Sequence, residues 1–472
     1  MNFYQATQIG KERIIGLDDL GNVLTWNEVE SIASRFRQEV QPQRVGLVLT
    51  QNSIDCFAGI VALMNCGVVP LLVDLNSDVV MIQNLINVYS PEYLYVPSSD
   101  AKTFTGFAIT ILQGEYSLCS NKQQSQSIVH HDLALLLSTS GSTGSPRLVR
   151  QSHSNLKSNG SSIIEYLGIT SSDRPITSLP MHYTYGFSVI NSHLMAGASI
   201  MITNRSVMEK QFWSFFRESA ATSLAGVPYT YTILKRLGMD RMELPSLATM
   251  TQAGGKLPKP IIEEFARFAD ERGIKFFVMY GQTEATARMS YVPAEFASKK
   301  AGSIGVPIPN GEFFLIDSDN KVIESQNQDG QLGYRGPNVT MGYAENRLDL
   351  SKGDERDGVL LTGDIAYRDE DGFYFVTGRI SRFVKVFGKR VSLDDIEQIL
   401  LPIVGDVACS GVEDEVSIWI TDASKKEEIR KSVAIRTAIH PSAFTVHVLE
   451  AIPRTSAGKI DYQNLPARIN HG

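Results

Sequence analysis

An apolar run at residues 133–137 breaks into a loop of small polar residues, TSGSTGSPR, that ends at Arg147. Five apolar residues bounded by turn formers predict a buried strand, and the loop glycines allow the backbone to approach a ligand closely. Successive backbone N–H groups and hydroxyls can bind phosphate oxygens, and the guanidinium of Arg147 can pair with them bidentately. A flexible surface loop is the alternative when this composition is taken alone. The predicted polyphosphate site comprises Thr139, Ser140, Gly141, Ser142, Thr143 and Gly144, followed by Arg147.

A second group with possible chemistry, VMYGQTEAT, lies at residues 278–286, directly after a predicted strand. Gly281 allows a tight turn, and Tyr280 offers a flat face on which a purine can stack. Glu284 is a hard oxygen ligand suited to Mg²⁺, and Thr283 can donate a hydrogen bond to a phosphate. Taken alone, the segment could equally be a strand end with a capped turn.

Three further segments follow toward the C-terminus. In LLTGD, the carboxylate of Asp364 can accept hydrogen bonds from two adjacent ribose hydroxyls. The stretch GRISRFVKVFGKRVSLDDIE begins at Gly378, and the loop IPRTSAGKI carries Lys459. Taken alone, the second stretch fits a charged surface hairpin, and a lysine near a terminus is usually a solvated charge.

Together and in this order, the segments resemble the motifs of the adenylate-forming enzymes, which include acyl-CoA synthetases, peptide-synthetase adenylation domains and luciferases. The resemblance covers nearly the whole chain. It implies that Arg379 contacts the ribose or phosphate region and that Gly388 lies where a thiol acceptor passes. It also implies that Lys459 meets the carboxylate and the α-phosphate during adenylation. Gly254 and Gly255 are counted with the nucleotide-binding residues.

Two positions depart from the family pattern. The phosphate loop of the family ends in lysine, where this chain has Arg147, which keeps the charge but changes its geometry. The family's hinge acid falls on Ser381, so domain rotation is expected while its pivot is left open.

The segment LPMHYTYGFS, at residues 179–188, corresponds to the acyl pocket of the family. Acyl-CoA synthetases commonly have a histidine where this chain has Tyr183, and a histidine stands one position earlier. Amino-acid-activating members of the family usually have an aspartate in this segment that pairs with the substrate ammonium, and no acid occurs here between Leu179 and Leu194. The resemblance therefore disfavours a free α-amino acid, because an unpaired buried ammonium would be costly. Aromatic packing is the alternative role for the tyrosines. The predicted pocket residues are His182, Tyr185, Gly186, Val227 and Tyr229.

The elements that must position these residues alternate between apolar runs and helical periods. Strands are predicted at 45–50, 68–73 and 93–96, with helices at 53–66 and 77–89 between them. This alternation is typical of parallel βαβ units. The stretch 117–127 is expected to form a surface loop. The predicted fold is α/β, with a large multi-sheet adenylation domain at 1–380 and a small, mobile α+β lid domain at 381–472.

Composition limits the class of protein. The 472 residues exceed one ordinary core, and 43% hydrophobic with 20% charged residues are typical of a globular protein. A net charge of −7 argues against a nucleic-acid partner. The four cysteines form no Cys-x-x-Cys pair, which favours a reducing cytoplasm, and neither a signal peptide nor a membrane-inserted segment is expected.

The motifs thus predict an AMP-forming acid–thiol ligase that uses ATP and Mg²⁺. A small acyl or aryl carboxylic acid would become an acyl-adenylate and then pass to a thiol of CoA or of carrier-protein phosphopantetheine. Several alternatives stay open at this point. They are a stand-alone amino-acid adenylation enzyme that loads an acyl carrier protein, another use of the adenylate, and a non-catalytic nucleotide-binding relative.

Overall fold

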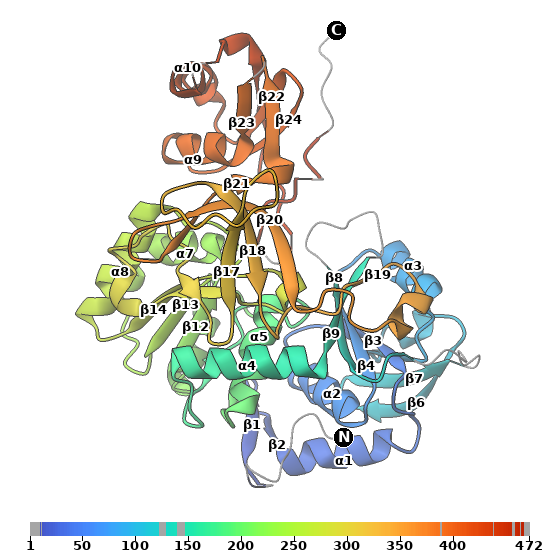
Figure 1. The fold of residues 1–472 in the computed structure, drawn as a ribbon. Coiled ribbons are helices and arrows are strands. Elements are labelled where there is room, and N and C mark those ends of the chain that lie inside the picture. The colour runs from blue at the N-terminus through green and yellow to red at the C-terminus, as the bar shows by residue number, and fades with distance from the viewer. Residues whose placement is uncertain are drawn as a thin grey trace. The chain divides into compact units, whose positions relative to one another are not determined.

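The computed structural model describes residues 10, 12–121, 129–138, 147–387, 389–437, 439–455, 458–462 and 464–466. The chain forms two compact units (Figure 1). The first unit comprises Met1–Ala301, Pro307–Glu312 and Arg335–Leu360, and the second comprises Gly302–Val306, Phe313–Tyr334 and Leu361–Gly472. The predicted boundary at residues 380 and 381 falls inside the second unit and stays a prediction. In the part of the chain described here, no helix is both long and apolar enough to cross a bilayer.

An eight-stranded sheet in the first unit carries the predicted phosphate loop. Its central strands β8, β4, β3 and β5 are parallel, joined by helices α2 (Ile54–Asn65) and α3 (Val79–Tyr89). Apolar side chains on both faces of these strands enter separate core clusters, which explains their continuous apolar runs. The order is β19 (Tyr343–Ala344), β9 (Leu148–Ser152), β8 (Leu133–Ser138), β4 (Val69–Asp74), β3 (Val45–Thr50), β5 (Tyr93–Pro97), β7 (Tyr116–Asn121) and β6 (Phe107–Gln113).

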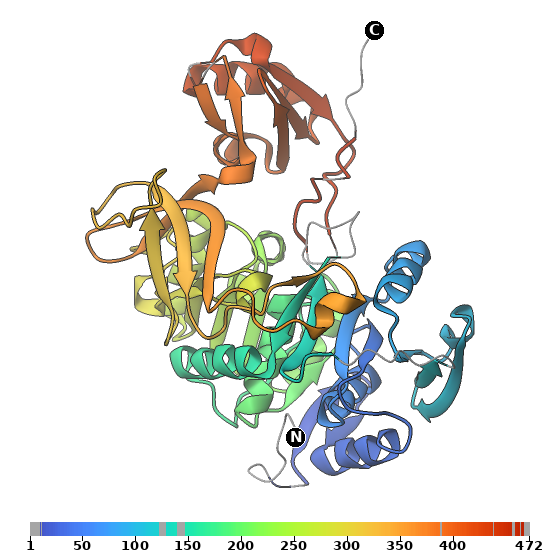
Figure 2. The same cartoon turned by 45° about the vertical axis from the view of Figure 1, so that its right-hand side comes forward.

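One expectation about this sheet is wrong. Residues 117–121, predicted as surface loop, belong to β7, which pairs with both β5 and β6 and is buried over most of its length. Figure 2 shows the β6–β7 hairpin curling at the edge of the sheet. The polar composition of SLCSN hid a strand whose backbone hydrogen bonds are satisfied on both sides.

A second sheet in the first unit carries the predicted acyl-pocket and turn residues. Helix α4 (His153–Leu167) leads into this sheet from β9. The helices that connect its strands are α5 (Thr184–Met195), α6 (Lys210–Glu218), α7 (Pro228–Arg236) and α8 (Lys259–Glu271). A capping box formed by Thr25 and Glu28 starts helix α1 (Trp26–Phe36). The sheet includes, in order, β15 (Ser290–Val292), β14 (Lys275–Tyr280), β13 (Thr249–Gln252), β12 (Ser223–Gly226), β10 (Pro175–Ile176), β11 (Ile200–Ile202), β1 (Ile14–Asp18) and β2 (Val23–Thr25).

The second unit contains a four-stranded sheet and a C-terminal α+β part. The sheet order is β17 (Glu312–Ile316), β18 (Gly330–Arg335), β20 (Val359–Arg368) and β21 (Tyr374–Arg379). A hairpin turn at Asp371-Gly372 joins β20 to β21, and Gly372 has a left-handed φ of 85°.

The C-terminal part surrounds an apolar cluster of its own. Strands β22 and β23 form a hairpin, as the stretch after Gly378 suggests when it is taken alone. The elements are β22 (Phe383–Val386), β23 (Lys389–Ser392), α9 (Leu393–Val404), β24 (Val407–Val412), β25 (Glu415–Ile420), α10 (Lys426–Thr437) and β26 (Phe444–Val448). The α/β class with several sheets is as predicted.

Candidate functional site

The hairpin β8–β9 holds the two ends of the predicted phosphate loop together. Ser138, at the end of β8, pairs with Leu148, at the start of β9. Residues 139–146, which include the predicted phosphate ligands Thr139, Ser140, Gly141, Ser142, Thr143 and Gly144, lie outside the described residues. Arg147 is described, and its guanidinium stacks on the ring of Tyr343, with Cζ 3.4 Å from the ring centroid.

Tyr343 also contacts the predicted Mg²⁺ ligand. Its hydroxyl donates a hydrogen bond of 2.7 Å to Oε1 of Glu284, and the guanidinium Cζ of Arg356 lies 4.6 Å from the ring centroid. Burial and the neighbouring Glu284 carboxylate raise the pKa of Tyr343 above its ordinary value, so this hydroxyl keeps its proton. The structure therefore brings Arg147 and Glu284 to one aromatic ring. Sequence reasoning named both charged residues and missed Tyr343 and Arg356.

The turn that carries Glu284 follows β14 and is fixed by its surroundings. At Gly281 a Cβ atom would overlap the carbonyl oxygen of Ala287, so only glycine fits there. The Glu284 carbonyl accepts hydrogen bonds from the backbone N–H of Thr340, at 3.0 Å, and from Arg356, at 3.1 Å. Glu284 is thus held through both its backbone and its side chain.

The other predicted residues of this turn are half-buried. The Tyr280 hydroxyl accepts a hydrogen bond of 3.3 Å from the side-chain amide of Gln282, and the Thr283 carbonyl lies 3.5 Å from the Gln151 amide nitrogen. These contacts leave the purine-stacking role of Tyr280 and the phosphate role of Thr283 as predictions.

A cavity of about 390 Å³ adjoins Tyr343 and carries charges of both signs. The buried guanidinium of Arg150 pairs with Glu355 at its wall and donates to the Met341 carbonyl at 2.9 Å. The cavity is lined by Gly342, Tyr343, Glu345, Asn346, Asp349, Lys352, Glu355 and Arg356.

His182, the first predicted pocket residue, lies between polar partners from two strands of the eight-stranded sheet. Its Nδ1 is 3.0 Å from the Thr50 hydroxyl, and its Nε2 is 3.6 Å from Oδ2 of Asp74. Burial lowers the pKa of His182 although Asp74 opposes the shift, which favours the neutral ring at pH 7. The absence of an acid in the local segment therefore did not predict the surroundings, because Asp74 comes from the end of β4.

The remaining pocket predictions divide between buried and exposed positions. Tyr185 is buried, with its hydroxyl 2.8 Å from the Thr251 hydroxyl, and burial raises its pKa to about 12. At Gly186 a Cβ atom would overlap the carbonyl oxygen of Pro180. Val227 is buried, whereas Tyr229 is 38% exposed.

Gly254 connects this region to the predicted nucleotide glycines. Its φ is +84°, and a Cβ atom would overlap the hydroxyl of Tyr183 and lie 3.1 Å from Cγ1 of Val227. At Gly255 a Cβ atom would instead meet the Pro228 ring at 3.1 Å. The structure thus places Gly254 against a predicted pocket residue.

Within the second unit, the predicted ribose ligands lie together. Asp364 is 1% exposed, and its Oδ1 accepts a hydrogen bond of 2.9 Å from Nε of Arg379. Ser381 lies in the short 3-10 turn Ile380–Arg382, and Gly388 lies outside the described residues.

Lys459 lies on a closed turn of the same unit. The Thr455 N–H donates to the Lys459 carbonyl at 2.8 Å, and the Arg454 guanidinium donates to the Gly458 carbonyl at 3.1 Å. Arg454 also pairs with Asp406 at 2.7 Å, which ties the turn to the start of β24. The backbone that carries the predicted catalytic lysine is therefore anchored.

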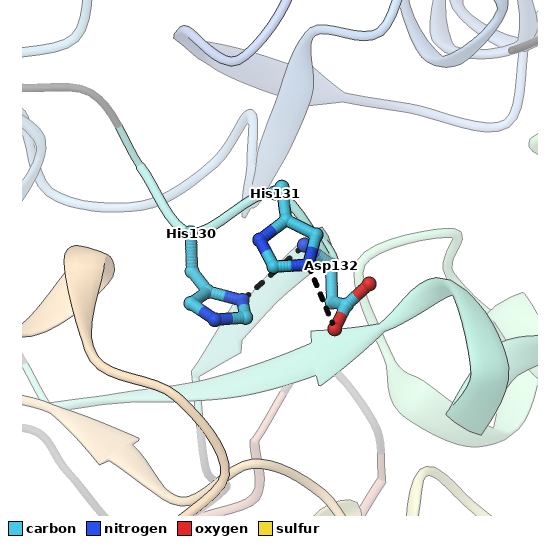
Figure 3. Close-up of side chains that lie close together, drawn as sticks. All are labelled: His130, His131 and Asp132. Carbon is cyan, nitrogen blue, oxygen red and sulfur yellow. Dashed lines mark hydrogen bonds and ion pairs between the residues drawn. The ribbon is translucent and has the colours of Figure 1, made fainter.

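A further group of possible metal ligands is formed by His130, His131 and Asp132 (Figure 3). Nε2 of His131 is 3.5 Å from Oδ2 of Asp132, and the Asp132 N–H donates to Nδ1 of His130 at 3.3 Å. The His131 and Asp132 side chains are 71% and 60% exposed. Among the described residues no second group of three or more such ligands is present, so Glu284 belongs to no cluster of that size. This fits Mg²⁺, whose remaining ligands are commonly water and substrate phosphates.

Comparison with known proteins relates the chain to enzymes that bind AMP. Residues 22–344 match the family described as AMP-binding enzyme. A 2-succinylbenzoate–CoA ligase of Bacillus subtilis (strain 168) is 31% identical over 337 residues, which are 69% of this chain and 67% of the relative. A 4-coumarate–CoA ligase-like protein of Arabidopsis thaliana is 28% identical over 395 residues, covering 80% and 68% of the two chains.

Solved structures match along nearly the whole length. The o-succinylbenzoate CoA synthetase of Bacillus subtilis, in complex with an acyl-adenylate intermediate, aligns with a TM-score of 0.81 and 24% identity. That alignment covers 99% of this chain and 98% of the other. The same enzyme with ATP and magnesium ion gives the same TM-score over 98% and 99% of the chains. At this identity the likeness establishes the fold.

Proposed function

This chain belongs to the family of AMP-binding enzymes, and we propose that it is an AMP-forming acid–thiol ligase. A carboxylate oxygen of the acid attacks the α-phosphorus of ATP, and the bond to the leaving pyrophosphate breaks. A thiolate then attacks the acyl carbonyl carbon, and AMP leaves with the electron pair of the mixed anhydride bond. The observation that carries the proposal is the meeting of Arg147 and Glu284 on Tyr343, at the end of the predicted phosphate loop.

Each residue of this cluster has a separate task. The guanidinium of Arg147, stacked on the Tyr343 ring, supplies positive charge where pyrophosphate charge develops. Glu284 provides a fixed carboxylate oxygen. Mg²⁺ bound there would offset charge on the phosphate oxygens. Such preorganised electrostatics stabilise a transition state because no reorganisation is needed during the reaction.

We propose a small acyl or aryl carboxylic acid as the substrate. The predicted pocket residues Tyr183, Tyr185 and Val227 are aromatic or apolar, and burial lowers the pKa of His182, which favours its neutral form. A substrate ammonium would have to compete for Asp74 with His182 and with the backbone N–H of Asn76, which lies 3.0 Å from Oδ1. The relatives named above suggest 2-succinylbenzoate and 4-coumarate as the first acids to try.

CoA is the acceptor that the relatives' names favour, and a carrier-protein phosphopantetheine is the alternative. We also propose a cytoplasmic location, because Cys56, Cys66, Cys119 and Cys409 are all buried thiols. Burial raises the pKa of Cys56 and Cys66 to about 11, so both stay protonated and unreactive.

Acid-dependent ATP–pyrophosphate exchange tests the proposal. A panel should contain 2-succinylbenzoate, 4-coumarate, oxalate, short fatty acids and free α-amino acids. Exchange with one or more of the carboxylic acids, and little with the amino acids, is expected. Exchange confined to amino acids would overturn the substrate class, and ATP binding without any exchange would indicate a non-catalytic relative. Thioester formation with CoA, compared with a pantetheinylated carrier, then identifies the acceptor.

A further inference from the structure

Tyr343 belongs to none of the motifs that predicted the site, yet it contacts the two charged groups on which the proposed chemistry depends. It lies on β19, where it pairs with Val149, two residues after Arg147. Its hydroxyl binds Glu284 and its ring carries Arg147. One side chain therefore connects the end of the phosphate loop to the predicted metal ligand.

The hydroxyl contact fixes how the carboxylate can be used. A hydrogen bond to a charged acceptor is stronger than one between neutral groups. With Oε1 of Glu284 engaged by Tyr343, the other oxygen, Oε2, has no partner among the described residues. The carboxylate is thus prepared to give one oxygen to a cation in a fixed orientation. Without the hydroxyl, the side chain would have to be ordered on binding.

The ring contact explains how an arginine can stand where the family has lysine. A guanidinium stacks on an aromatic face over its whole plane, whereas an ammonium is a compact point charge. Nε of Arg147 is buried without a hydrogen-bond partner in the described part of the chain, and its ion pair with Glu345 is long, at 3.9 Å. The Tyr343 ring, 3.4 Å from Cζ, is therefore the main support of this side chain among the described residues.

We propose that Tyr343 is a positioning residue that orients the Glu284 carboxylate through its hydroxyl and the Arg147 guanidinium through its ring. This inference rests on the proposed function, since it concerns the same nucleotide site. Arg147 and Tyr343 form a functional pair, in which each side chain is most effective when the other is present.

Tyr343→Phe tests the hydroxyl, because it keeps the ring beneath Arg147. The Mg²⁺ concentration for half-maximal exchange should rise about tenfold, the size expected for one lost hydrogen bond to a charged group. Calorimetric binding of ATP should weaken by a similar factor with Mg²⁺ and change less than twofold with EDTA. Tyr116→Phe is the matched control, since it removes a buried hydroxyl bound to the Leu49 carbonyl at 2.9 Å and should leave both measurements unchanged.

A double-mutant cycle tests the ring. Arg147→Lys should weaken ATP binding several-fold in the wild-type background and by less than twofold in Tyr343→Leu, because the guanidinium has then already lost its stacking surface. Equal effects in both backgrounds would overturn the pairing. Circular dichroism checks the folding of each variant. The test of the hydroxyl by Tyr343→Phe does not depend on the folding of Tyr343→Leu.

The two levels of inference fail in different ways. Wild-type Mg²⁺ dependence in Tyr343→Phe would overturn the positioning role while exchange activity persists. Absence of exchange in the wild-type protein, with the metal-dependent binding defect of Tyr343→Phe intact, would overturn the ligase function and leave the positioning role standing.

Discussion

Replacing Gly254 with alanine tests the geometry of the predicted pocket, because a single methyl group meets two obstacles there. The backbone at Gly254 has φ +84°, and the new Cβ would overlap the hydroxyl of Tyr183. The neighbouring Gly255 provides a matched control, since its φ is not left-handed and an added Cβ would only touch the Pro228 ring at 3.1 Å. Both variants add the same methyl group, at adjacent positions of the chain.

The expected cost of Gly254→Ala has two parts. Left-handed backbone costs an L-residue about 1–2 kcal/mol. Displacing the buried Tyr183 ring adds about 1–3 kcal/mol, as overpacking does in other cores. The total is about 2–5 kcal/mol. For Gly255→Ala, a tight contact of under about 1 kcal/mol is offset by the reduced entropy of the unfolded chain, about 0.4–1 kcal/mol, so its net effect is close to zero.

Urea denaturation of both variants measures these differences, and exchange kinetics measures their effect on the pocket. Gly254→Ala should lower the unfolding midpoint and raise KM for the acid, because Tyr183 and Val227 must move. Gly255→Ala should keep its midpoint, so that any increase in its KM for ATP reports a direct nucleotide contact. Equal stability of the two variants would refute the steric reasoning, and an unchanged KM for the acid in Gly254→Ala would remove Val227 from the pocket.

Three further predictions follow from the charged groups. Glu284→Gln should lower the exchange rate about a hundredfold or more and weaken its dependence on Mg²⁺. The control Glu264→Gln removes a surface carboxylate paired with Lys235 and should behave as wild type. An unaltered Mg²⁺ titration of Glu284→Gln would show that Glu284 has only a structural role. Lys459→Ala should lower acid-dependent exchange about a hundredfold to thousandfold, while supplied acyl-adenylate is still converted to thioester. Lys425→Ala, at a lysine paired with Glu428, is the control. Loss of both half-reactions in Lys459→Ala would refute a role of Lys459 in adenylation alone. Burial raises the pKa of Glu397 to about 7. Arg382, the Cys409 N–H and the Tyr462 hydroxyl act in the opposite direction and lower this pKa. Because this folded-state pKa lies above the unfolded value, the carboxyl contributes most stability below about pH 4.5, and this contribution is lost as the pH rises through 7. Glu397→Gln should therefore flatten the pH dependence of the urea midpoint between pH 5 and 8, and an unchanged slope would contradict the assignment.

Local motifs predicted the parts of the site that a short stretch of chain builds alone. The strand before the phosphate loop, the turn at Gly281 and the family itself were all inferred from residue types and order, and the family is confirmed by the match over residues 22–344. The strand and the turn depend on neighbours within a few residues, such as Gly281 against Ala287, and the family follows from the order of several such segments. Periodicity and turn chemistry carry that information.

The missed residues reach the site from distant segments. Tyr343 lies 59 positions after Glu284, and Thr50 contacts His182 across 132 positions. No local pattern marks such partners, because strand order and not sequence spacing brings them together. The error at β7 has the same cause, since its polar residues are buried by two neighbouring strands.

Ser381 stands where the family has its hinge acid, and the next residue, Arg382, is held by several side chains. Arg382 donates to Asp394 at 2.5 Å and to Glu397 at 2.6 Å, and its guanidinium lies 4.0 Å from the Tyr462 ring centroid. Tyr462 lies three residues beyond Lys459, and its hydroxyl donates a hydrogen bond of 2.9 Å to Glu397. The chain is therefore tied, from Arg382 onward, to the turn that carries the lysine. We therefore expect the predicted rotation of the lid domain to have its pivot at or upstream of Ser381 and to move the lysine turn and α9 together.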